Sequence, residues 1–226
     1  MGQYNFDEII DRRGTGCLKY DGLSMEKGRN DLKPFWIADM DFKTPDFVVD
    51  ALKKRLEHPI FGYPQTPVDY FEVISSWVEN LHGWKVGPDN FRYIPGIVKG
   101  IGFALDCFCN KGDKVIIQPP VYHPFRLTPQ KHDLQVIFNP LKPVIKPDVD
   151  GYGTLVTYEM DFDHLESVID DKTKFLILSN PHNPVGICWS EDTLKKLAEI
   201  TSRHGVMVIS DEIHCDLVLP GHKHTP

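Results

Sequence analysis

Residues 175–186 read FLILSNPHNPVG, an apolar run that leads directly into a loop with two Asn-Pro steps. The apolar run has no alternating polar position, which is typical of a strand covered on both faces. A second run of this kind, VMVIS, occupies residues 206–210. Such strands occur mainly in parallel sheets that have helices on both sides. The sequence therefore predicts an α/β fold with three layers, helix, sheet and helix, in which the sheet is mostly parallel.

Strands and helices are expected to alternate from residue 91 onward. Apolar runs predict strands at 91–94, 114–118, 135–138, 174–178 and 206–210. Helical spacing and capping residues predict helices at 96–108, 124–130, 161–169 and 190–205, after two earlier helices at 45–56 and 67–82. The segment 140–160 is rich in Pro and Gly, and we expect a loop or a hairpin there.

Composition narrows the class of protein. The chain has 226 residues, 41% of them hydrophobic, and a net charge of -7. A nucleic-acid partner is not expected, because no basic face is visible, and neither is a membrane, because no apolar run is long enough to cross one. The five cysteines are an odd number, and most lie in or beside apolar runs. We therefore expect buried, reduced thiols in a cytoplasmic protein without a signal peptide.

The predicted strand exits hold the residues that can carry chemistry, since ligands of such sheets collect at the carboxyl ends of strands. Asp211 follows a buried strand in SDEIH, and a buried acid is costly unless it is paired. Gly96 precedes a predicted helix whose free N–H groups suit a phosphate. Tyr122 lies in the exit PPVYHPF, and Asn183 lies in the Asn-Pro loop. Each residue also has a purely structural interpretation. Asp211 can form a structural salt bridge, and Gly96 can be an ordinary helix start. Tyr122 can be a packed loop aromatic, and Asn183 can be part of a rigid turn.

The order of these four motifs resembles the fold-type I enzymes that use pyridoxal 5'-phosphate (PLP), the class I/II aminotransferase superfamily. The stretch WIADMDF at 36–42, with NFD at 5–7 and DRR at 11–13, resembles the MalY/PatB branch of cystathionine β-lyase-type C–S lyases. This resemblance covers the chain from residue 4 to 226. It implies a lyase that eliminates a thiol from an L-cysteine conjugate to give pyruvate and ammonia. A class I/II aminotransferase stays open, as does a non-catalytic fragment that binds only a cofactor or a partner.

The resemblance implies roles around the pyridine ring of PLP. Asp211 would sit at the ring nitrogen and keep it protonated. Asn183 would donate to the ring 3'-oxygen, and Tyr122 and Ile213 would cover the two ring faces. His214 falls where many members of the superfamily carry a tyrosine, so its role is less defined.

The resemblance also implies how the phosphate is held and how the chain is organised. The backbone N–H groups of Ile97 and Val98 would bind the phosphate, and Tyr63 would reach it across the interface of a homodimer with a shared active site. Residues 1–45 would belong to a small domain, and 46–226 to the PLP-binding large domain.

The lysine that forms the Schiff base with PLP is expected after a further strand, and no lysine of this chain has that context. Lys223 lies in GHKHTP, twelve residues beyond Asp211, without a strand before it. We therefore expect a chain that is incomplete at its C-terminus, lacks the Schiff-base lysine and the substrate-carboxylate arginine, and is inactive alone.

No metal site is expected. A group formed by His214, Cys215, His222 and His224 has a suggestive His-x-His spacing, but no matching ligand pair lies on a rigid element elsewhere.

Overall fold

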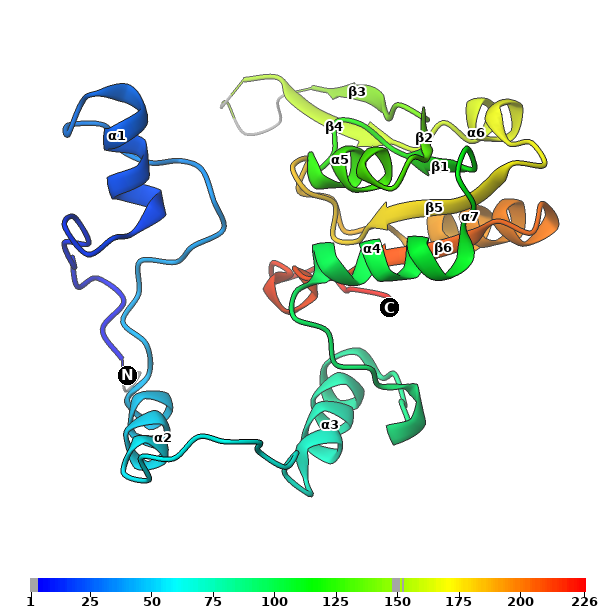
Figure 1. Ribbon diagram of the computed structural model, residues 1–226. Helices are drawn as coiled ribbons and strands as arrows, with labels where there is room; N and C mark the ends of the chain where they lie inside the picture. Colours follow the sequence, from blue (N-terminus) through cyan, green and yellow to red (C-terminus); the bar gives the residue numbers. More distant parts are fainter. Residues whose placement is uncertain (1–3, 148–150, 152) are drawn as a thin grey trace. The chain divides into compact units, whose positions relative to one another are not determined.

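The computed structural model describes residues 4–147, 151 and 153–226. The chain divides into two compact units, residues 1–66 and residues 67–226, and each is described by itself (Figure 1). The predicted domain boundary between residues 45 and 46 falls within the first unit. That domain assignment stays a prediction.

The first unit holds a short π-helix, η1 (Leu18–Gly22), followed by α1 (Leu23–Lys27) and α2 (Asp46–Leu56). Salt bridges link Arg12 and Lys19 of this unit to Asp39 and Asp41. Arg12 contacts Asp39 at 2.7 Å and Asp41 at 2.8 Å, and Lys19 contacts Asp41 at 2.7 Å. These bonds from Lys19 and Arg12 lower the pKa of Asp41 to about 2. Asp39 and Asp41, the two acids of the WIADMDF stretch, thus hold residues 36–42 against the segment around Arg12.

The second unit is built on a parallel sheet of four strands with the order β2-β1-β5-β6. Its strands are β1 (Lys114–Ile117), β2 (Gln135–Phe138), β5 (Thr173–Ser179) and β6 (Met207–Asp211). The strands β3 (Lys142–Lys146) and β4 (Leu155–Glu159) form the antiparallel hairpin that was one of two possibilities for 140–160. The predicted α/β class with a mostly parallel sheet is confirmed.

Helices cover both faces of this sheet (Figure 1). On one face, Val115 and Ile117 pack with Ile101 and Leu105 of α4 (Ile97–Phe108) and with Phe125 of α5 (Pro124–Lys131). On the other face, Ile116 and Leu176 pack with residues of α6 (Phe162–Val168) and α7 (Glu191–Arg203). Successive strand residues point to opposite faces, so the uninterrupted apolar runs supply both cores.

Two helix starts agree with the predicted caps. Asp161 accepts the N–H of His164 at 3.0 Å, and Ser190 accepts the N–H of Thr193 at 3.2 Å. Such bonds satisfy donors that a helix start leaves free.

The predicted strand at 91–94 is wrong. These residues form no strand and follow a 3-10 turn, η2 (Pro88–Asn90). The ring of Phe91 stacks on Phe71 of α3 (Tyr70–His82) with centroids 5.3 Å apart. The apolar residue at the start of this segment therefore packs on a helix and not in a sheet.

The cysteines differ in part from expectation. All five are free thiols, but none is fully buried, and Cys107 is exposed. No helix among the described residues is long and apolar enough to span a bilayer.

Candidate active site

The exits of three neighbouring strands are tied together by hydrogen bonds. The N–H of Tyr122 donates to the carbonyl of Asn183 at 3.1 Å. The N–H of Asn180 donates to the carbonyl of Asp211 at 3.0 Å. His182 Nε2 lies 3.0 Å from the carbonyl of Pro120. The structure thus brings the loops of Tyr122, Asn183 and Asp211 to one edge of the sheet, because parallel strands end at the same side.

Asp211 is a buried acid at the end of β6, with 7% of its surface exposed. One carboxylate oxygen accepts the N–H of Ile213 at 3.1 Å. Burial raises the pKa of Asp211 above its usual value. In the part of the chain that the structure describes, no Lys or Arg forms an ion pair with it. The plain reading of Asp211 as a structural salt bridge therefore finds no support here, and the carboxylate is suited to a cationic ligand.

The phosphate-binding prediction concerns the start of α4. Gly96 precedes the helix with φ 111° and ψ 142°, a backbone conformation that residues with a side chain rarely adopt. The helix then begins at Ile97, and its first N–H groups, including those of Ile97 and Val98, have no carbonyl within the helix to bind. Figure 1 shows α4 beginning at the same edge of the sheet at which β5 ends. The helix start is therefore suited to an anion at that edge.

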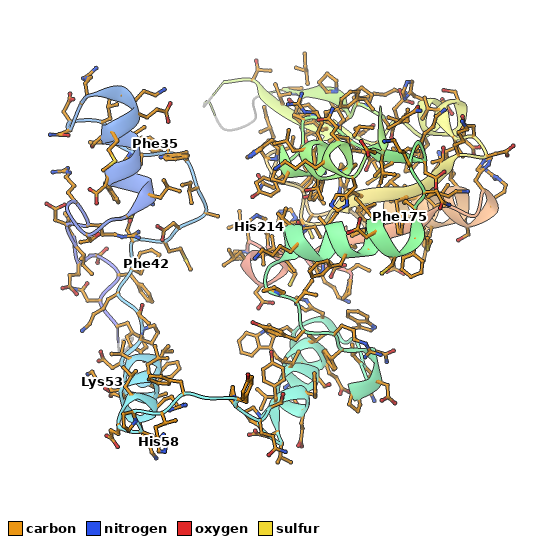
Figure 2. The ribbon with its side chains drawn as sticks, viewed as in Figure 1. Phe35, Phe42, Lys53, His58, Phe175 and His214 are labelled. Atoms are coloured by element: carbon orange, nitrogen blue, oxygen red, sulfur yellow. The ribbon has the colours of Figure 1, made fainter. Side chains whose placement is uncertain are left out.

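Asn183 and His214 line one cavity of about 540 Å³. His182, Cys188 and His222 line it as well. Figure 2 labels His214, which belongs to the turn between β6 and the 3-10 turn η3 (Cys215–Leu217). The cavity thus collects two of the predicted site residues from different loops.

The other predicted ring contacts lie outside the lining of this cavity. Tyr122 is 36% exposed and Ile213 is 65% exposed, so both are open to a ligand from solvent. Tyr63 is fully exposed and belongs to the first unit. Its predicted contact with a partner subunit stays a prediction.

His182 was not assigned a role from the sequence, although it stands between the two Asn-Pro steps. It is 2% exposed, and burial lowers its pKa. Its neutral ring donates from Nε2 to Pro120, while Nδ1 has no partner among the described residues. His182 therefore holds the Tyr122 loop against the Asn183 loop. The feature of the sequence that could have indicated this role is the position of His182 between the two Asn-Pro steps.

The donor set fits PLP. A buried carboxylate without a cation can hold a protonated pyridine nitrogen, and a free helix start can hold a phosphate. A half-exposed aromatic ring such as Tyr122 can cover a flat ring. Fold and site together define a PLP-dependent transferase-type large domain.

Comparison with known proteins agrees with this class. Residues 35–226 match the family model of aminotransferase class I and II. The chain belongs to this family, whose cofactor is PLP.

Three relatives are informative. Cystathionine beta-lyase PatB of Bacillus subtilis is 43% identical over 98% of this chain and 55% of its own length. The solved PLP-bound C–S lyase of Staphylococcus hominis is 36% identical with a TM-score of 0.86, covering 100% of this chain and 55% of that one. The PLP-bound putative aminotransferase of Clostridium difficile is 40% identical with a TM-score of 0.89, covering 99% and 55%. The chain spans about half the length of the relatives it matches.

Proposed function

We propose that this chain forms the cofactor-binding part of a PLP-dependent C–S β-lyase of the cystathionine β-lyase type. The observation that carries the proposal is the buried Asp211 carboxylate, which forms no ion pair with a Lys or Arg of the described chain and lies at the strand exits joined to Tyr122 and Asn183. The similarity to PatB and to a solved C–S lyase supports the choice of elimination. The substrate is an L-cysteine conjugate, and the products are a thiol, pyruvate and ammonia.

PLP, when bound, supplies an electron sink for the charge that develops at the substrate Cα. Asp211 would keep a proton on the ring nitrogen, because a neighbouring carboxylate favours the charged form of a base. Asn183 would donate to the ring 3'-oxygen, and His214 lines the same cavity. Tyr122 and Ile213 would exclude water from the two ring faces.

The N–H groups of Ile97 and Val98 would hold the phosphate of the cofactor. We further propose that Tyr63 of a second copy completes this site in a cytoplasmic homodimer.

The test uses the complete gene product with PLP and cystathionine. Release of both pyruvate and a thiol is the expected result, and the absence of both would refute lyase activity.

An aminotransferase is the second candidate, supported by the similarity to the putative aminotransferase. Both reactions begin with removal of the same Cα proton, so Asp211 and Asn183 serve either. A keto-acid acceptor separates them. Without an acceptor, transamination stops with the cofactor as pyridoxamine phosphate, and an added keto acid takes up the amino group and restores PLP. Elimination leaves the cofactor as PLP and needs no acceptor.

A further inference from the structure

Three metal-ligating side chains meet at a place that the proposed active site does not use. His82 ends α3, while Cys215 and Asp216 lie in η3, more than 130 positions later in the chain. One ligand atom from each lies within 4.8 Å of the other two. The sequence analysis expected no metal site and set aside a group of Cys215 with His214, His222 and His224; the structure places Cys215 beside a different pair, His82 and Asp216.

The separations of these ligand atoms are close to those of a zinc site. His82 Nε2 lies 3.2 Å from Asp216 Oδ1, and Cys215 Sγ lies 3.5 Å from the same oxygen. Zinc lies about 2.3 Å from a sulfur ligand and about 2.0–2.2 Å from a nitrogen or oxygen ligand. In a tetrahedral site, two ligand atoms are then about 3.4 Å apart for nitrogen and oxygen, and about 3.6 Å apart for sulfur and oxygen. Two of the three separations are close to these values, and the third, between His82 and Cys215, is at most 4.8 Å.

The surroundings of the cluster also suit a metal. Trp77 Nε1 donates to Asp216 Oδ2 at 2.9 Å, which orients the carboxylate and leaves Oδ1 toward His82 and Cys215. Ligating carboxylates are usually held by such an outer hydrogen bond. The His82 side chain is 9% exposed and that of Asp216 is 44% exposed, so one side of the cluster is closed and the other is open to water.

The plain alternative is a structural hydrogen-bond cluster. In that case His82 and the Trp77 indole share the carboxylate, and the thiol makes only a weak contact at 3.5 Å. Because Cys215 directly precedes Asp216, their contact by itself fits either reading. The observation that favours a metal is that His82, from a different element, lies against the same carboxylate oxygen as the thiol.

We propose that His82, Cys215 and Asp216 bind one divalent zinc-class cation, with water in the fourth position. Cysteine and histidine together select zinc over magnesium or calcium. The cation would tie α3 to the turn that carries Ile213 and His214, and so to one side of the proposed ring site.

The experiment titrates zinc into the complete gene product, first stripped with a chelator, in competition with a chromophoric zinc indicator. We expect one zinc per chain. Cys215→Ser and His82→Gln each weaken binding at least about 100-fold, since loss of an outer partner alone weakens it about 10- to 100-fold. Trp77→Phe removes the outer hydrogen bond to Asp216 and should weaken zinc binding by about 10- to 100-fold. Cys109→Ser, which removes another partly buried thiol, leaves the affinity unchanged.

Cobalt substitution of the unmutated protein provides a second readout that needs no variant to fold. A thiolate-to-cobalt charge-transfer band supports the site. The proposal is overturned if the protein takes up no stoichiometric zinc, if cobalt shows no such band, or if Cys215→Ser and Cys109→Ser bind zinc equally well.

Discussion

Replacing Asp211 with Asn should raise the stability of the PLP-free protein and should weaken its affinity for PLP. The amide has the shape of the carboxylate and keeps an oxygen for the N–H of Ile213, so the change removes mainly a charge. In the PLP-free protein, burial raises the pKa of Asp211 above 3.8, so the folded state binds its proton more tightly than the unfolded state does. The stability of the unmutated protein therefore falls, relative to Asp211→Asn, as the pH rises above about 3.8.

The magnitude follows from the burial. Asp211 is 7% exposed, and its carboxylate accepts a hydrogen bond from the N–H of Ile213, so a poorly compensated charge costs about 1–3 kcal/mol at neutral pH. Asp211→Asn should gain an amount of this order without PLP. With PLP, the variant loses the partner of a buried cation, which costs about 3 kcal/mol, or roughly a hundredfold in Kd.

Urea unfolding of the complete gene product between pH 4 and 8 measures the first effect, and PLP titration followed by absorbance measures the second. Asp171→Asn is the matched control, because it removes the same charge from an exposed turn. The reasoning fails if Asp211→Asn binds PLP as tightly as the unmutated protein. It fails equally if the PLP-free variant is no more stable than the control.

Three further changes test the fold and the site. Leu176→Ala empties a fully buried position in the sheet and should cost about 2–5 kcal/mol, seen as a lower urea midpoint with an unchanged m-value. Gly96→Ala meets no atom within 4 Å but must adopt φ 111°, so backbone strain alone should cost about 1–3 kcal/mol in the same assay. Because the folded pKa of Asp41 is lowered to about 2, its ion pairs stabilise the first unit above pH 3.8 and are lost as the pH falls toward 2. Trp36, which donates to the carbonyl of Lys19 at 3.2 Å, should report this step by fluorescence, and Asp41→Asn should abolish it.

The sheet could be predicted from the sequence because its signals are local. The run at 175–178 is apolar at every position, and the structure divides it between two cores, with Phe175 and Ile177 in one and Leu176 and Leu178 in the other. The same reasoning failed for 91–94, which Arg92 interrupts, because a short and mostly apolar segment does not say whether its partner is a strand or a helix such as α3.

The strand-exit motifs located Asp211, Asn183 and Tyr122, since parallel strands bring their ends to one edge. Contacts made by long-range packing could not be found in this way. His82 and Asp216 are 134 positions apart, and neither stands in a pattern that points to the other. His182 was visible in its loop, but its bond to Pro120, 62 positions away, was not.

The charges at the strand exits restrict what the site can bind, independently of any relative. Asp211 places a buried negative group at the end of β6, and burial raises its pKa, so a cation beside it is favoured. The start of α4 places unpaired N–H groups and the positive end of a helix dipole at the same edge, which favours an anion. Tyr122 adds an uncharged flat surface whose loop is bonded to that of Asn183. A flat ligand with a cation at one end and an anion at the other would satisfy all three. A protonated pyridine ring with a phosphate arm meets this requirement, whereas a nucleotide, whose base carries no positive charge at neutral pH, would leave Asp211 unpaired.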